Sequence, residues 1–141
     1  MTTHILNEEE KMLQNLVRDF ADRELSVRAR EVDEKEEFSW ENWHGLGQLG
    51  ITGIGIDPKY GGSGGGYRQA SIAAAETARG DVSASTTLIA HLSLGTSTIY
   101  RFGNEEQKLR FVPPLASGKS IAAWALTEPG GGSDAASLQT T

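Results

Sequence analysis

The sequence predicts a mainly α-helical protein, in which a helical bundle is followed by the first strand of a second domain. Two observations predict the bundle. Apolar side chains recur at helical spacing through residues 7–117, and residues that cap helices stand where these patterns begin. The strand is predicted by the apolar run 121–126, which leads into a glycine-rich turn. We therefore place an α-helical domain at residues 1–117 and the start of a β domain at residues 118–141.

The first predicted helix runs from residue 8 to about residue 33. Asn7 can cap it, and Glu10 stands where a capping box places its carboxylate. The helix is amphipathic, with charged residues opposite an apolar face. That face consists of Leu13, Leu16, Val17, Phe20 and Val27. The charged run 31–37 is predicted to be its solvated end.

The second predicted helix begins after Ser39, a capping residue, and ends at Gly50. Apolar residues at three-residue steps, Trp40 and Trp43 among them, form one edge, so both tryptophans are predicted to lie in the core. The stretch 51–58 is apolar and broken by glycine, which indicates an extended buried segment. The next six residues, 61–66, are five glycines and one serine, so they are predicted to form a flexible loop.

Three further helices are predicted. One spans residues 67–79, and its alanines permit close packing against a neighbouring helix. The next begins at Asp81 or Ser83 and ends near residue 103; because it carries few polar side chains, we expect it to be the most buried helix. A capping-box pattern at residues 104–107 starts the last one, which Pro113 and Pro114 are predicted to disrupt.

Composition excludes several classes of protein. The chain has 141 residues, a formal net charge of −6 and no cysteine. The negative charge argues against binding nucleic acid, and the lack of cysteine excludes disulfides and thiolate chemistry. Three scattered histidines suggest no metal site. We see no membrane span and no secretory signal, and expect a cytoplasmic protein, or a mitochondrial matrix protein in a eukaryote.

Several short patterns have a structural explanation that we prefer. Residues 45–50 match the G-x-G-x-x-G fingerprint, but a helix rather than a strand precedes them. The Arg-Gly-Asp sequence at 79–81 marks the end of one helix and the cap of the next. His91 taken alone is expected to be a hydrogen-bonded core histidine. Glu128 is expected to hold its turn by accepting backbone N–H bonds rather than to act as a base.

Six segments resemble one known family. The most specific is residues 124–134, Trp-Ala-Leu-Thr-Glu-Pro-Gly-Gly-Gly-Ser-Asp, in which a strand end leads into bare backbone amides that suit a phosphate. The other segments are residues 56–65, 76–79, 91–95, 102–108 and 114–119. Together, and in this order, they resemble the acyl-CoA dehydrogenase family over nearly the whole chain.

The resemblance implies an N-terminal helical domain followed by the start of a middle β-barrel domain. It also implies α,β-desaturation of an acyl-CoA thioester, with hydride transfer to FAD. The flavin-binding residues that it implies are Trp124, Ala125, Leu126, Thr127, Gly132 and Ser133. The substrate-binding residues that it implies are Ser133, Leu92, Ser93 and Gly95. The catalytic glutamate of the family belongs to a further helical domain, so no catalytic residue is assigned in this chain, and no metal is expected.

The resemblance further implies an electron-transfer flavoprotein as electron acceptor and a homotetramer as the full-length assembly. A single strand needs a partner for its backbone groups, so we expect the chain to stop inside its second domain. In isolation it is expected to bind FAD weakly or not at all and to lack turnover. Alternatives are an acyl-CoA oxidase or flavin monooxygenase of the same fold, or a non-enzymatic helical binding module.

Overall fold

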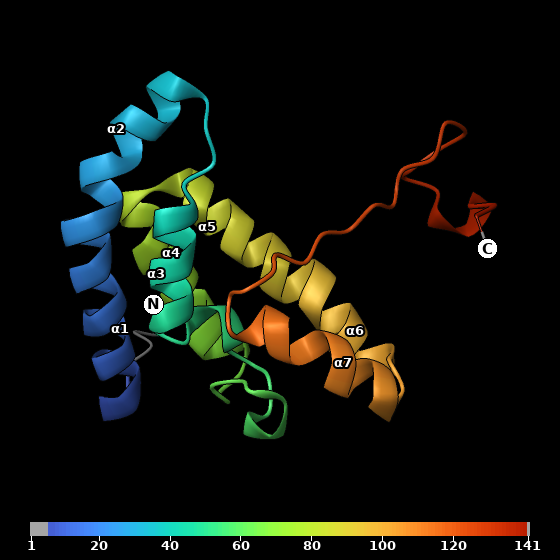
Figure 1. Cartoon of the computed structure of the whole chain (residues 1–141), viewed down its shortest axis with the longest axis horizontal. Helices are drawn as coiled ribbons and strands as arrows, with labels where there is room; N and C mark the ends of the chain where they lie inside the picture. The colour runs from blue at the N-terminus through green and yellow to red at the C-terminus, as the bar shows by residue number, and fades with distance from the viewer. Residues whose placement is uncertain (1–5, 141) are drawn as a thin grey trace, which may run out of the picture.

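The computed structural model describes residues 6–140, so the predictions that concern His4 and the extreme N-terminus lie outside it. Helices pack side by side into one body, from which the C-terminal part of the chain projects (Figure 1). The longer elements are α1 (Glu8–Phe20), η1 (Ala21–Leu25), α2 (Ser26–Lys35), α3 (Trp40–Gln48), α4 (Tyr67–Gly80), α5 (Val82–Ile89), η4 (Ala90–Thr96), α6 (Ser97–Phe102) and α7 (Glu105–Ala116). The short turns are η2 (Ile51–Gly53), η3 (Pro58–Tyr60) and η5 (Ala135–Ser137).

Two continuous rods dominate the arrangement, and each contains a π-helical stretch. The first rod is α1, η1 and α2, and the second is α5, η4 and α6. A π-helical turn accommodates an extra residue, shifts the following side chains around the helix axis and occurs frequently at functional sites. In the second rod, this stretch carries His91 at the centre of the body.

The predicted helix starts are confirmed, with local hydrogen bonds as their cause. Asn7 and Glu10 form the capping box at the start of α1, with bonds of 2.8 and 2.9 Å. Asn104 and Gln107 form the same motif at α7, with two bonds of 2.9 Å. The Asp81 carboxylate accepts from the first amides of α5. Each cap satisfies amides that the helix itself cannot pair.

The predicted break at Pro113 and Pro114 is wrong, because α7 continues through both prolines to Ala116. A proline inside a helix removes one backbone donor. The two carbonyls that lose their donors belong to Leu109 and Arg110, which are exposed, so water can bond them. The helix therefore tolerates the prolines on its solvated side.

The predicted flexible loop at residues 61–66 is also wrong. It folds back on residues 53–56 through backbone bonds, including Gly55 N–H to the Gly64 carbonyl at 2.8 Å and Gly64 N–H to the Ile56 carbonyl at 2.9 Å. A β-carbon at Gly62 would lie 2.5 Å from the Ile56 carbonyl carbon. Its glycines therefore permit close backbone approach. The neighbouring stretch 51–58 is not one extended segment, since it begins with η2 and ends where η3 begins.

Two predictions of burial need correction. Trp43 is buried as predicted, but Trp40 is 53% exposed and packs only along the surface, against Phe38 and His44. The rod of α5, η4 and α6 is buried on one face only. On its other face Ile89 and Leu94 are about half exposed. Helical spacing identifies which side chains form an apolar face, but it does not show which of them other elements of the fold cover.

The core lies where α1, α3 and α4 meet the second rod. Fully buried aliphatic side chains fill it, and each contributes on the order of 1.5–3 kcal/mol by leaving water. Its main cluster is Val17, Leu46, Ile51, Ile54, Ala73 and Leu88.

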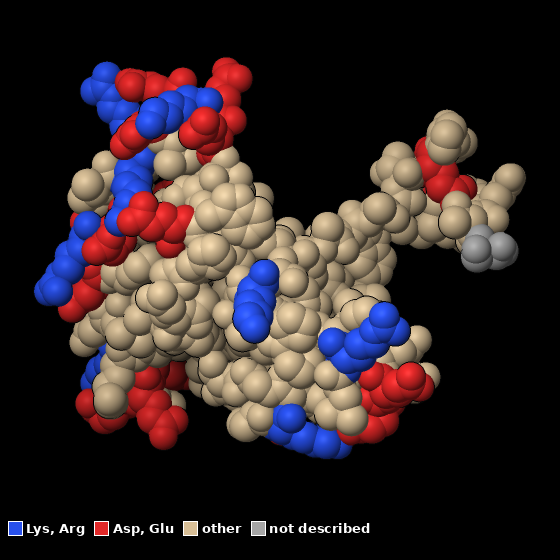
Figure 2. Space-filling model, in the orientation of Figure 1, with Lys and Arg blue, Asp and Glu red and all other residues tan. Residues whose placement is uncertain are grey.

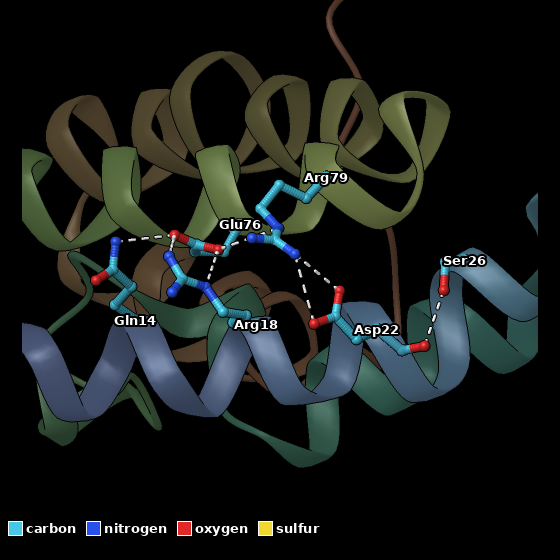
Figure 3. Close-up of polar contacts among 6 residues, drawn as sticks. All are labelled: Gln14, Arg18, Asp22, Ser26, Glu76 and Arg79. Atoms are coloured by element: carbon cyan, nitrogen blue, oxygen red, sulfur yellow. Dashed lines mark hydrogen bonds and ion pairs between the residues drawn. The ribbon is translucent and has the colours of Figure 1, made fainter.

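Helices α1 and α4 are also joined by a charged network (Figure 3). Glu76, which is 5% exposed, accepts bonds of 2.8 and 2.9 Å from Arg18 and one of 2.8 Å from Gln14. Arg79 adds an ion pair with Glu76 at 3.6 Å and a second one with Asp22 on η1 at 3.1 Å. These bonds keep the pKa of the Glu76 carboxyl below its ordinary value despite its burial.

Among residues 6–140, no helix is long and apolar enough to cross a membrane.

Candidate functional site

The C-terminal segment, residues 121–140, leaves the helical body as a thin, extended trace (Figure 1). It carries all the residues predicted to bind a flavin. The predicted strand has no ladder partner in the part of the chain that the structure describes. From Ala123 to Thr127, no backbone amide or carbonyl takes part in a hydrogen bond among the described residues. The segment thus offers a run of unpaired backbone donors and acceptors.

The side chains along this run are accessible. Trp124 is 47% exposed and Leu126 is 38% exposed, and the hydroxyls of Thr127 and Ser133 also face solvent. A flat aromatic, an apolar side chain and two hydroxyls on bare backbone fit a planar polar heterocycle that ends in phosphate. The residues present therefore fit the predicted flavin.

The glycine-rich turn after Thr127 is closed by paired bonds. Glu128 N–H donates to the Gly131 carbonyl at 2.9 Å, and Gly131 N–H donates back at 3.1 Å. A β-carbon at Gly130 would meet open space, and one at Gly132 would lie 2.8 Å from the Thr127 hydroxyl oxygen. Gly132 therefore lets the turn approach Thr127, while Gly130 leaves room for a ligand.

The prediction that Glu128 accepts backbone N–H bonds is confirmed, although the bonds come from beyond its turn. Its carboxylate accepts backbone N–H bonds from Gln139 at 3.0 Å and from Thr140 at 2.8 Å. The hydrogen bonds from Thr140 and Gln139 lower the pKa of Glu128. Glu128 stays ionised at neutral pH and ties the end of the segment back to its turn.

A cavity of about 160 Å³ lies between η4, the start of α4 and the 54–56 stretch. Its walls are mainly apolar, from Ile54, Ile56 and Leu92, and Ser93 adds a hydroxyl. Leu92 and Ser93, both predicted substrate-binding residues, therefore border one cavity.

Gly95 does not line this cavity but lies on a buried side of η4. A β-carbon there would touch the Ala122 side chain and lie 2.8 Å from the Ala122 carbonyl carbon. Its lack of a side chain is explained by close packing against the start of the C-terminal segment. Its binding to substrate stays a prediction.

Charge is mixed on the displayed face of the body. Acidic and basic side chains alternate over α1 and α2, and the centre of this face is mostly uncharged (Figure 2). Several of these charges pair with one another, as Arg30 does with Glu34 at 2.8 Å. Such interspersed charge is typical of a solvated surface rather than of a phosphate-backbone interface.

Comparison with protein families agrees with this geometry. The model of the acyl-CoA dehydrogenase N-terminal domain matches residues 7–119. The chain belongs to the acyl-CoA dehydrogenase family. The matched range is the helical body, so the acyl-CoA dehydrogenase assignment rests on the same residues that form the fold.

Individual acyl-CoA dehydrogenases are similar over almost the whole chain. An acyl-CoA dehydrogenase of Bacillus subtilis (strain 168) is 40% identical over 136 residues, which are 96% of this chain and 36% of that protein. The Bacillus anthracis acyl-CoA dehydrogenase complexed with FAD has a TM-score of 0.89 at 35% identity, over 98% of this chain and 24% of that one.

A structure described as the electron transferring flavoprotein of Acidaminococcus fermentans has a TM-score of 0.92 at 33% identity, over 99% of this chain and 37% of that one. The chain thus spans about a third of the length of the curated acyl-CoA dehydrogenase that it matches.

Sequence reasoning missed how residues 116–122, which lead into the C-terminal segment, are anchored to the body. Trp43 N–H donates to the Gly118 carbonyl at 2.8 Å, Thr52 hydroxyl to the Ala116 carbonyl at 2.9 Å, and Ala122 N–H to His91 Nδ1 at 2.9 Å. The partners lie between 31 and 75 residues apart. No local pattern signals contacts of that range, although the residue types, an indole, a hydroxyl and an imidazole, are those that seek a partner when buried.

Proposed function

We propose that this chain supplies the N-terminal helical domain and part of the flavin site of an FAD-dependent acyl-CoA dehydrogenase, with the domain boundary near residue 117. The observation that carries the proposal is the run from Trp124 to Ser133 next to a body of this family, in which the backbone groups of residues 124–127 and the hydroxyls of Thr127 and Ser133 are free for a ligand. The FAD-complexed relative supports the choice of cofactor.

Each residue of the run has a proposed role. The Thr127 hydroxyl would donate a hydrogen bond to the polar edge of the flavin ring, and the Leu126 backbone would assist. Trp124 and Ala125 would lie along the ring edge. The Ser133 hydroxyl would bond the pyrophosphate, and Gly132 keeps the turn close to Thr127.

FAD, when bound, supplies an electron sink that accepts hydride from the β-carbon of the acyl group. In that chemistry, the proposed role of this chain is to orient the flavin and the acyl group and to exclude water from them. Leu92 and the other apolar residues of the cavity would surround the acyl tail, and Ser93 would contact its polar end. The base that removes the α-proton is proposed to lie in a different part of the protein.

A relative from Acetobacterium woodii, 40% identical over 136 residues, is described as a subunit of a caffeyl-CoA reductase–Etf complex, which supports an electron-transfer flavoprotein as electron acceptor. An acceptor of this kind favours a dehydrogenase over an oxidase, whose reduced flavin reacts with oxygen. Slow reoxidation by oxygen, together with fast reoxidation by an electron-transfer flavoprotein, is the expected kinetic result.

Removing one hydroxyl tests the flavin site. Thr127→Ala in the complete protein is expected to raise the dissociation constant of FAD about tenfold, the equivalent of one hydrogen bond of about 1.4 kcal/mol. Flavin fluorescence titration measures it. Ser137→Ala is the matched control, because its exposed hydroxyl bonds only Asp134 within the same segment. Equal FAD affinities of the two variants would contradict the proposed hydrogen bond from Thr127 to the flavin.

A further inference from the structure

His91 is buried at the centre of the body, in a role that the proposed chemistry does not use. Its exposed fraction is 0%, and it lies in the π-helical stretch η4. The Trp43 ring packs edge-on against the imidazole, with centroids 4.9 Å apart. Both ring nitrogens have partners, so the histidine has a defined orientation.

The partners determine which nitrogen carries the proton. Ala122 N–H can only donate, so Nδ1, at 2.9 Å, must accept. The Thr52 carbonyl can only accept, so Nε2, at 3.2 Å, must donate. His91 is therefore the neutral Nε2–H tautomer.

The surroundings keep it neutral. The groups that face the ring are the Trp43 indole, the Thr52 and Leu115 carbonyls, the Thr96 hydroxyl and the Ala122 amide, and none of them carries a charge. Burial lowers the pKa of His91. A second proton on Nδ1 would point at the Ala122 N–H and break their bond.

The hydrogen bond from Ala122 N–H to His91 Nδ1 fixes the point at which the chain leaves the helical body. Among the described residues, Ala122 is the last residue of the chain that hydrogen-bonds to the helical body, and Trp124 follows two positions later. The same residue packs against Gly95 of η4, where a side chain would collide with it. Both contacts come from η4, so this stretch sets where the C-terminal segment starts and which way it points.

We propose that His91, as the neutral Nε2–H tautomer, is a positioning residue for the flavin site. It acts through Ala122, whose amide it holds, and so determines the direction in which Trp124 to Thr127 leave the body. The role of this direction in flavin binding rests on the proposed function, whereas the anchoring of Ala122 does not.

Two neutral substitutions separate the two ring nitrogens. His91→Asn places an amide oxygen near the position of Nδ1, so it keeps an acceptor for Ala122. His91→Gln places its donor near the position of Nε2, so it keeps the bond to Thr52 and leaves Ala122 without an acceptor. Both variants are polar, uncharged and smaller than histidine, which makes each the control for the other.

The first measurement is amide hydrogen exchange at Ala122 in the protein without FAD. Exchange in His91→Asn is expected to stay within about threefold of the unsubstituted protein, and in His91→Gln to rise at least about tenfold, with the amides of α1 and α4 unchanged. Nitrogen-15 spectra of the unsubstituted protein are expected to show Nε2 protonated and Nδ1 bare. This second measurement needs no variant to fold. Equal exchange in both variants, or a protonated Nδ1, would overturn the anchoring.

The second readout is the FAD affinity of the complete protein and of its two His91 variants. His91→Gln is expected to raise the dissociation constant about tenfold and His91→Asn to leave it near that of the unsubstituted protein. If all three bind FAD equally, the positioning role is wrong although the proposed function stands. If the unsubstituted protein binds no FAD, the proposed function is wrong, and the exchange experiment still decides the anchoring.

Discussion

The chain contains two glycine-rich stretches of similar composition but opposite surroundings. Residues 61–66 fold back on residues 53–56, and Gly62 has no room for a side chain beside the Ile56 carbonyl. The turn 128–132 projects from the body, and Gly130 meets nothing within 4 Å. Most amides of the first stretch donate to residues 53–58 of the body, whereas the bonded amides of the second, those of Glu128 and Gly131, donate only within the turn. Composition alone did not distinguish them; the packing around each does.

The body and the C-terminal segment differ in the same way in the surroundings of their tryptophans and glutamates. Trp43 is 2% exposed and Trp124 is 47% exposed. Glu76 bonds across two helices, whereas Glu128 bonds only residues of its own segment. We infer that stability is concentrated in the body, residues 8–118, and that the C-terminal segment is kept available for a ligand.

The largest expected effect comes from the tryptophans. Trp43→Ala removes a fully packed indole and its bond to Gly118, so it is expected to cost about 3–5 kcal/mol of unfolding free energy. Trp124→Ala is expected to change it by less than about 0.5 kcal/mol. Urea denaturation followed by far-UV circular dichroism measures both. Similar losses in the two variants would mean that the segment packs on the body after all.

Alanine at the two glycines gives an intermediate effect. Gly62→Ala forces a β-carbon against the Ile56 backbone, and is expected to cost about 1–3 kcal/mol. Gly130→Ala has open space and is expected to stay within about 0.5 kcal/mol of the parent. Thermal unfolding midpoints, compared at one pH, measure the difference. A tolerated Gly62→Ala would show that the 61–66 loop can move away from residue 56.

The smallest of the three effects concerns Glu76 and depends on pH. Bonds from Arg18 hold its folded-state pKa below that of the unfolded chain, so the unfolded state binds a proton first as the pH falls. This stabilisation is present above about pH 4.3 and is lost below it. Glu76→Gln is expected to cost about 1–2 kcal/mol at pH 7, toward the low end because Arg18 is partly hydrated.

Denaturation of the parent and of Glu76→Gln at pH 7 and pH 3 measures this dependence, and their difference should shrink at the lower pH. Glu128→Gln is the matched control, with an unfolding midpoint expected to equal that of the parent at both pH values. A constant difference between parent and Glu76→Gln would show that the carboxylate charge is not what stabilises the α1–α4 junction.

Local signals predicted the helix starts correctly, because a cap such as Asn7 with Glu10 is complete within four residues. The wrong predictions are those that needed distant neighbours. Trp40 has a core-like spacing, but no element covers it. Pro113 and Pro114 have the local signature of a helix end, yet the carbonyls they leave without a donor belong to exposed residues.

In the candidate site, too, local features could be predicted from the sequence and long-range contacts could not. Thr127 and Ser133 were located through the resemblance of a contiguous segment, and the structure places both at the surface. The bond between His91 and Ala122 joins positions 31 residues apart, and the cavity beside Leu92 has walls from three separate stretches. Neither could be read from spacing, because both depend on how η4 packs against segments far from it in the sequence.

The bond from Trp43 to Gly118 has a further consequence for how the chain acquires its shape during synthesis. It joins residues 75 positions apart, and Thr52 bonds Ala116 across 64. Until the ribosome has released residue 118, the indole N–H near the centre of the nascent domain has no acceptor, and closing so long a loop is entropically unfavourable. The bonds to Ala116 and Gly118 therefore cannot form until the chain that leads directly into the glycine-rich turn has been made.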